Sequence, residues 1–411
     1  MNTEPSSEEE RTVVDLLAAH PLLGRVEHSG NVVRVWARPE DLRVQRTDGG
    51  LTLGSLVDEH LKQWSEVYDF TYSGPVSDPN LDLSGWRSSD TGEPFPRSQM
   101  AEWADHTIDL ILKTEPRSVV EVGCGTGILL HRLLPHIGRY VGLDVAGEVI
   151  SRHRKAGLQG ATFCHAAAHE LHTPAVSDAL TELGLIDTVV LNSVTQCFGS
   201  VDYLTGVIHD MISIVRPGGS VIVGDIRHSG LENQFVQWLA ASAGESTRTS
   251  TAEDTEMLLD PSTLAQVAAE APQQTRLVTL PKTMSYDNEL SRYRFDAVFL
   301  VSGGGSVGYG DESIGWKPNG LLSDAPNAQA PAELRASCAA SEVVVLHPDD
   351  PELVGIASSL DAGAYTREHV SVPPQPHEPL EAFARRKLAE ECTRKLRRAG
   401  LPPCEIEVHL P

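Results

Sequence analysis

The stretch Ser118–Asp144, SVVEVGCGTGILLHRLLPHIGRYVGLD, decides the fold of this chain. It opens with the mostly apolar run Val119–Val122, typical of a buried strand, and continues into the glycines of GCGTG. An apolar helical pattern follows, and a second apolar run, Tyr140–Leu143, ends on Asp144. The order strand, glycine turn, helix, strand and acid predicts the first half of a nucleotide-binding βαβ unit.

The glycines and acids of this stretch indicate the kind of ligand. Glycine lets the backbone turn tightly and approach a ligand that a Cβ would exclude. The carboxylate of Asp144 can accept two hydrogen bonds from ribose hydroxyls. The third glycine stands one residue earlier than in the dinucleotide fingerprint, which binds a pyrophosphate at a helix N-terminus. Glu121, just before the glycines, would repel a pyrophosphate and favours a cationic ligand.

An acid, three alternating glycines and a second acid after the next strand resemble motif I of class I S-adenosylmethionine (SAM) methyltransferases. SAM carries a sulfonium and an ammonium and no phosphate, so acids on both sides suit it. The alternative is a glycine turn in another α/β protein. The resemblance implies a Rossmann-like α/β fold with a seven-stranded, mostly parallel sheet, and S-adenosyl-L-homocysteine as the product of SAM. The residues that it assigns to the cofactor are Glu121, Gly123, Gly125, Gly127, Asp144, Ala168, His169, Asn192 and Ser193.

Composition excludes several classes of protein. The chain has 411 residues and a net charge of −24, which argues against general nucleic-acid binding. No apolar run approaches the roughly 20 residues that span a bilayer, and the acidic start, MNTEPSSEEER, does not resemble a secretion signal. The six cysteines are scattered without a CxxC pair, as expected for reduced thiols rather than disulfides or a zinc site. We therefore expect a cytoplasmic protein.

Changes in composition predict four parts of the chain. Residues 1–57 form a small N-terminal α/β segment, and residues 58–115 form a helical lid and lead-in. Alternating strands and helices over residues 116–302 predict the SAM-binding core. The glycine-rich stretch Ser302–Gly310 is the clearest boundary, and residues 303–411 are expected to form a linker and a small C-terminal α/β domain.

Several blocks narrow the resemblance further. VVLNSVTQCFGSVDYL, GGSVIVGDIR and NELSRYRFDAVFL, with QWSEVYDFTY and GWRSSDTGEPFPRSQMAEW upstream, resemble methyltransferase domains embedded in nonribosomal peptide synthetases. The resemblance covers residues 58–302. That family N-methylates aminoacyl or peptidyl thioesters held on a carrier protein, and some relatives methylate carbon.

The resemblance implies a SAM-dependent methyltransferase of specialised-metabolite biosynthesis, of the nonribosomal peptide and antibiotic type. Its acceptor would be a nitrogen of an amino-acid-derived or carrier-bound small molecule, without a nucleic-acid or membrane partner. One alternative is methylation of carbon or oxygen in a small molecule. Another is an inactive methyltransferase-like partner subunit. The oligomeric state is left open.

Four residues are candidates for catalysis: Asn192, Gln196, Asp225 and Arg227. They lie at the carboxyl ends of predicted strands or just after them, where open α/β sheets bind ligands. An α-amine with a pKa of about 8 needs little help from a base, and no metal-ligand cluster is seen, so we expect a site without a metal. The alternatives to a catalytic role are structural ones: Asn192 would be a loop amide, and Asp225 and Arg227 would form a structural ion pair.

The sequence departs from the family beside these candidates. The family usually has Tyr and then Phe-Pro after the Gln of its Asn-Ser-Val-x-Gln block, whereas Cys197, Phe198 and Gly199 stand here. The departure indicates an atypical acceptor.

The helix predicted over Glu378–Ala399 holds seven basic and four acidic side chains, a balance of 7 − 4 = +3. Residues at every fourth position should pack inward: Leu380, Ala384, Leu388, Cys392 and Leu396. The basic residues are either a solvated face or a docking surface for an acidic carrier protein.

Overall fold

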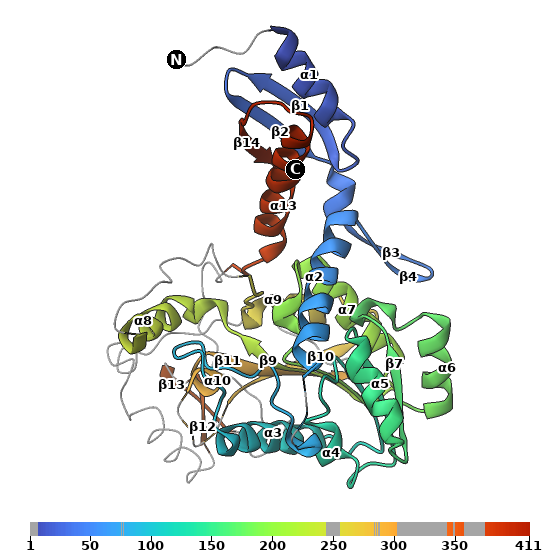
Figure 1. Ribbon diagram of the computed structural model, residues 1–411. Coiled ribbons are helices and arrows are strands. Elements are labelled where there is room, and N and C mark those ends of the chain that lie inside the picture. Colours follow the sequence, from blue (N-terminus) through green and yellow to red (C-terminus); the bar gives the residue numbers. More distant parts are fainter. Residues whose placement is uncertain are drawn as a thin grey trace.

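The computed structural model describes residues 7–74, 76, 78–243, 255–282, 284, 286, 288–301, 343–347, 350–356 and 375–411. A large α/β core forms the lower part of the molecule in Figure 1, and a smaller domain projects from it. The predicted linker Ser302–Gly310 and most of the region after it lie outside the described residues.

The core is built on a seven-stranded sheet. Its strands are β5 (Ser118–Val122), β6 (Arg139–Asp144), β7 (Ala161–His165), β8 (Thr188–Asn192), β9 (Ser220–Arg227), β10 (Thr275–Pro281) and β11 (Arg294–Val301). Their order is β10-β11-β9-β8-β5-β6-β7. The pairs from β9 to β7 are parallel, whereas β11 is antiparallel to both of its neighbours. The predicted Rossmann-like α/β fold with a mostly parallel sheet is confirmed.

Helices cover both faces of this sheet. Neighbouring residues of one strand, such as Val119 and Val120, belong to two different hydrophobic clusters, as the alternation of side chains along a strand requires. One face packs against α3 (Arg97–Leu112), α4 (Leu130–Leu133) and α5 (Gly147–Ala156). The other packs against α6 (Pro174–Leu183), α7 (Val201–Ile214) and α9 (Pro261–Ala269).

Some elements differ from the sequence prediction. The helix expected after the glycine turn is only the short α4. The helices α6 and α9 were not predicted, although each begins with a proline at its first turn, a common helix start. A hairpin of β3 (Val44–Thr47) and β4 (Gly50–Leu53) was also missed.

The projecting small domain joins the two ends of the chain. The N-terminal part supplies α1 (Ser7–Ala18), β1 (Leu23–Ser29) and β2 (Val32–Ala37), and the C-terminal part supplies α13 (Pro379–Arg398) and β14 (Glu405–His409). Strand β14 pairs in parallel with β2, which pairs antiparallel with β1. The two end segments that sequence analysis treats separately therefore share one sheet.

The helix α13 provides much of the small domain's core. All five residues predicted to face inward are at most 5% exposed: Leu380, Ala384, Leu388, Cys392 and Leu396. Val13 and Leu17 of α1 belong to the same cluster as the last four of these. The four-residue spacing identified the buried face correctly, because residues i and i+4 share one side of a helix.

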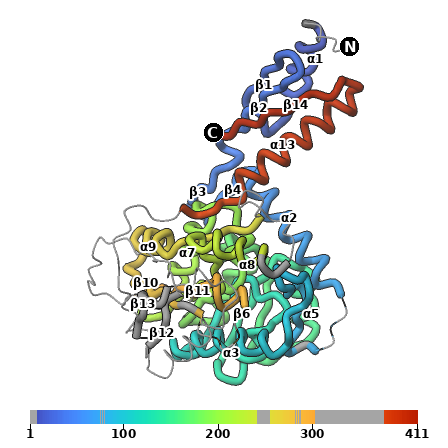
Figure 2. The backbone as a smooth tube through the Cα atoms, turned by 90° about the vertical axis from the view of Figure 1, so that its left-hand side faces the viewer, coloured from blue at the N-terminus to red at the C-terminus, as the bar shows by residue number. Residues whose placement is uncertain are grey.

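Two helices connect the small domain to the core. The helix α2 (Ser55–Tyr72) runs from one to the other, and Figures 1 and 2 show α13 passing beside its upper part. Lys387 of α13 lies 2.7 Å from the carboxylate of Glu59 on α2. No helix within the described residues is both long and apolar enough to cross a membrane.

Candidate functional site

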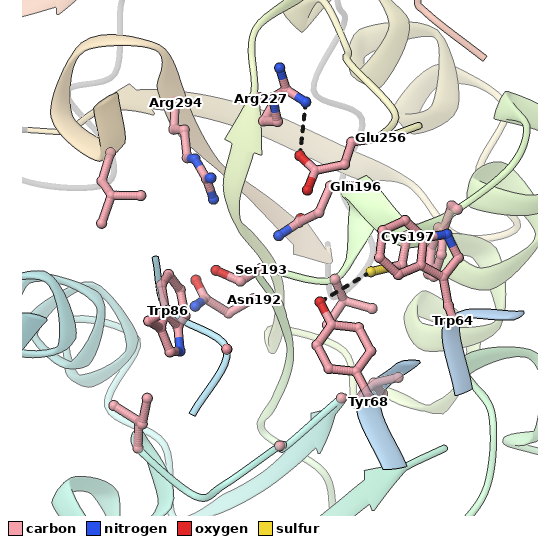
Figure 3. Close-up of a pocket in the computed structure, with 18 of the residues that line it drawn as sticks. Trp64, Tyr68, Trp86, Asn192, Ser193, Gln196, Cys197, Arg227, Glu256 and Arg294 are labelled. Atoms are coloured by element: carbon pink, nitrogen blue, oxygen red, sulfur yellow. Dashed lines mark hydrogen bonds and ion pairs between the residues drawn. The ribbon is translucent and has the colours of Figure 1, made fainter. Parts of the chain in front are cut away.

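A cavity of about 330 Å³ opens at the carboxyl ends of β5, β6 and β8. Its floor is the glycine turn after β5 and the turn after β8, and α2 contributes Leu61, Trp64, Tyr68 and Tyr72 to its wall. In Figure 3, Trp86 and Arg294 lie on one side of the cavity and Tyr68, Cys197 and Trp64 on the other. The cavity therefore lies at the sheet edge where parallel strands bind ligands.

The Asp144 carboxylate braces the glycine turn. It accepts hydrogen bonds from the backbone N–H of Gly125, at 2.7 Å, and of Ala146, at 2.8 Å. Gly125 has a φ of +48° and Gly127 one of +84°, a region that favours glycine. His153 of α5 contacts the carbonyl oxygen of Gly125 at 2.8 Å. The turn is thus held by two side chains, Asp144 and His153.

These residues fit SAM. Asp144 is 6% exposed and uses one lone pair of each oxygen on the backbone, so further lone pairs can accept from ribose hydroxyls. A Cβ on Gly125 would come within 3.1 Å of the Tyr72 hydroxyl, closer than ordinary van der Waals contact, so a glycine keeps the space between the turn and this side chain open. Ala166, Ala167 and Ala168 supply a small-residue wall beyond Asp144. The acceptor oxygens of Asp144 suit ribose hydroxyls, and the small alanine side chains leave room for a planar ring.

Glu121 is a buried acid at the bottom of the cavity. It is 3% exposed and accepts a hydrogen bond from the Tyr140 hydroxyl at 2.5 Å. Burial raises its pKa to about 8, against a smaller lowering by the Tyr140 hydrogen bond. At neutral pH the carboxyl of the free protein is therefore mostly protonated, and a cation nearby would favour its ionised form.

Two residues predicted at the cofactor do not line the cavity. The ring of His169 points toward Tyr203 on α7, with 3.0 Å between its Nδ1 and the hydroxyl oxygen. Gly127 lies behind the wall, where an added Cβ would approach His153 within 2.8 Å. Their effect on the site is through packing.

Asn192 and Gln196 line the cavity with their side-chain amides, and each residue is 7% exposed. Within the described part of the chain, neither amide oxygen has a hydrogen-bond partner. A buried acceptor without a donor costs about 1–3 kcal/mol. A ligand that brings N–H groups between these two amides would recover that free energy.

Asp225 lies behind the cavity rather than on its surface. It is fully buried, accepts from the Trp103 indole N–H at 3.0 Å and pairs with Arg294 at 2.5 Å. The Ser193 hydroxyl also donates to it. Burial raises the pKa of Asp225, but the charges of Arg294 and Lys282 and the hydrogen bonds outweigh burial, so the pKa stays below its usual range. This geometry makes Asp225 a positioning residue for the turn after β8.

The backbone here is held in a costly conformation. Ser193 has a φ of +57° and Asp225 one of +60°, values that cost a non-glycine residue about 1–3 kcal/mol. The pairing between β9 and β11 shifts register at Asp225, so the residue sits in a bulge and β9 continues to Arg227 instead of ending. The bulge turns the Asp225 side chain toward Ser193.

Arg227, a predicted site residue, lines the cavity. Its ion-pair partner, Glu256, was not predicted from the sequence. Nη1 of Arg227 lies 2.8 Å from Oε2 of Glu256, and the guanidinium lies 5.3 Å from the centre of the Phe235 ring. Glu256 also lines the cavity, above Gln196 in Figure 3. Nothing in the local sequence around Glu256 marks it, because its place depends on contacts with distant segments.

Part of the chain matches a known family of enzymes. Residues 120–221 match a family model described as a methyltransferase domain. The chain contains a methyltransferase domain. The predicted enzyme class and SAM as its cofactor are confirmed at this level.

The curated relatives are much longer proteins. Chondramide synthase cmdD of Chondromyces crocatus is 29% identical over 75% of this chain and 8% of its own length. The nonribosomal peptide synthetase asqK of Emericella nidulans is 34% identical over 59% of this chain and 10% of its own length. The chain thus spans a tenth or less of these two relatives, and the resemblance to methyltransferase domains of peptide synthetases is confirmed.

Solved structures align more loosely. The N-methyltransferase NodS from Bradyrhizobium japonicum WM9, in complex with S-adenosyl-L-homocysteine, is 17% identical, with a TM-score of 0.38 over 59% of this chain and 98% of that chain.

We expect Asp144→Ala to weaken SAM binding about ten- to a hundredfold, because a charged hydrogen-bond acceptor is worth about 1.5–3 kcal/mol. Since the same carboxylate braces Gly125, Asp144→Asn should lose less, as its amide oxygen still accepts one backbone N–H. Calorimetric titration with SAM measures both. Unchanged affinity in a folded Asp144→Ala variant would remove this residue from the cofactor site.

Glu121 should make stability depend on pH. Its folded-state pKa of about 8 exceeds the ordinary value of 4.5. Between these two pH values the folded protein binds more protons than the unfolded chain, so the free energy of unfolding falls as the pH rises from about 4.5 to about 8. One such group contributes at most about 1.4 kcal/mol per pH unit. Glu121→Gln should therefore gain thermal stability relative to the unaltered protein between pH 5 and pH 8. A difference that does not vary with pH would contradict the assignment.

Proposed function

We propose that this chain transfers a methyl group from SAM to a nitrogen atom of an amino-acid-derived acceptor, free or carried as a thioester on a carrier protein. The methyltransferase domain and the peptide-synthetase relatives support this class of acceptor. Methylation of carbon or oxygen is the alternative outcome of the test below.

The observation that carries the proposal is the polar lining beside the cofactor half of the cavity. The amide oxygens of Asn192 and Gln196 have no partner within the described residues, and Glu256 lines the same cavity (Figure 3). An amine has N–H donors for these acceptors and can still direct its lone pair at the methyl carbon. A carbon acid or a hydroxyl would bring fewer donors.

The chemistry asks little of the protein beyond orientation. Bound SAM would supply an electrophilic methyl group on a sulfonium. An α-amine with a pKa of about 8 is partly neutral at pH 7, so no strong base is needed. Tyr68 and Trp64 of α2, whose rings stack at 6.1 Å, cover the cavity and limit the access of water. The walls thus hold nucleophile and methyl group together.

The test is the position of the new methyl group. We expect the purified protein, with SAM and a panel of aminoacyl thioester mimics, to form N-methyl products that fragmentation in mass spectrometry identifies, with the same turnover in EDTA. A product methylated on carbon or oxygen would refute the nitrogen assignment, and activity restored only by magnesium would refute a metal-free site.

Glu256→Gln is the matched variant for this test, since it keeps the shape but removes the charge that would face the amine. We expect its kcat/KM to fall about ten- to a hundredfold, as for a charged hydrogen bond. Asp202→Asn, in the first turn of α7 and outside the cavity lining, serves as the control and should match the unaltered protein.

The surface of α13 supports a carrier-bound form of the acceptor. Arg394, Arg397 and Arg398 are exposed, and Arg394 makes a weak contact with Glu391 at 3.4 Å. In a chain with a net charge of −24, this basic patch would attract an acidic partner and speed encounter.

Reversing Arg394, Arg397 and Arg398 to Glu should slow methylation of a carrier-bound substrate and leave that of a small thioester mimic unchanged. The defect should shrink in high salt, because exposed charges are screened over about 8–10 Å near physiological ionic strength. Equal loss with both substrates would assign the patch to fold stability, and no loss with either would assign it to solvation.

A further inference from the structure

The acceptor side of the cavity is completed by a segment from the far end of the chain. Residues 377–380, just before and within the first turn of α13, lie against the loop that follows β8 and against the residues that carry Glu256. The contacts are made by backbone as well as side chains, so they fix position closely.

The first contact is with the loop after Gln196. The backbone N–H of Leu380 donates to the carbonyl oxygen of Gly199 at 3.0 Å. The Glu378 carboxylate accepts from the N–H of Val201, the first residue of α7, at 2.6 Å. An acid at a helix N-terminus pairs with otherwise unsatisfied N–H groups and with the positive end of the helix dipole. The loop is thereby held at its far end.

The second contact is with the residues beside Glu256. His377 and Leu258 form an antiparallel bridge with N–H···O distances of 2.9 and 3.2 Å. The N–H of Met257 donates to the carbonyl oxygen of Gln196 at 2.9 Å. Glu256 and Gln196, the two polar groups of the acceptor wall, are therefore tied to each other and to the C-terminal segment.

The packing at Gly199 leaves no spare room. A Cβ there would lie 3.1 Å from the His60 ring nitrogen of α2 and 3.2 Å from Cβ of Leu380. The His60 ring in turn meets Phe383 of α13 edge to face at 5.1 Å. Both helices that lead to the small domain thus converge on this point of the acceptor loop.

We propose that residues 377–380 are a positioning element for the acceptor wall, so that the small domain sets how Gln196 and Glu256 meet the acceptor. The inference rests on the proposed function. It assigns no group of this segment to the chemistry and leaves the cofactor end, at Asp144 and the glycine turn, independent of it.

The experiment compares Glu378→Ala and Gly199→Ala with the conservative Glu378→Gln. Glu381→Ala is the matched control, because Glu381 is an exposed acid three residues further along the same segment. We expect the first two variants to raise KM for an aminoacyl thioester about three- to tenfold, with kcat nearly unchanged and the SAM dissociation constant within about twofold. Glu378→Gln should recover most of the loss, since its amide oxygen still accepts from Val201, and Glu381→Ala should show none.

Hydrogen exchange provides a readout that does not need activity. The amides of Val201, Met257 and Leu258 should exchange faster in the first two variants, while those of the Gly123–Gly127 turn stay unchanged. Unchanged KM and exchange would overturn the inference. A rise in KM that is accompanied by losses of SAM affinity and of thermal stability would also overturn it, because the segment would then only support the fold. If the unaltered protein does not methylate the thioester, the proposed function is refuted. The exchange data would still show whether residues 377–380 position the acceptor wall.

Discussion

The carboxylate of Asp144 joins the two turns on which the site is built. One oxygen accepts from Gly125, in the turn after β5, and the other from Ala146, before α5. The ends of neighbouring parallel strands are thereby fixed to each other, with spare lone pairs directed at the cavity. Strand order then brings the turn after β8, with Asn192 and Ser193, to the same edge. The remaining walls surround this fixed edge.

The cofactor half could be predicted from the sequence because its information is local. The strand, the glycines and Asp144 lie within one stretch of 27 residues, Ser118–Asp144, and each has a conformational or hydrogen-bonding reason to be there. The acceptor half is different. Glu256 is placed at the cavity by its neighbours Met257 and Leu258, which bond to the backbone of Gln196 and His377. Asp225 is held behind the cavity by a bulge and by Trp103. No spacing in the sequence encodes such contacts.

The small domain shows the same limit on a larger scale. The buried face of α13 follows from its four-residue repeat, since helix geometry alone decides which side chains share a face. The partner of that face does not follow from it. Strand β14 pairs with β2, and Arg34 meets Glu407 at 2.7 Å although 373 residues separate them. The alternating pattern of a short amphipathic strand predicts which of its faces is buried, but not which strand it pairs with.

The unusual residues Cys197 and Gly199 can be understood from the same packing. Both lie where an element from outside the core contacts the acceptor loop. The Tyr68 hydroxyl of α2 lies 3.6 Å from the Cys197 sulfur, so α2 supplies an aromatic hydroxyl at this side of the cavity. At Gly199, an added Cβ would make tight contacts with Leu380 of α13 and His60 of α2. The acceptor loop is thus in contact with both helices that connect the core to the small domain.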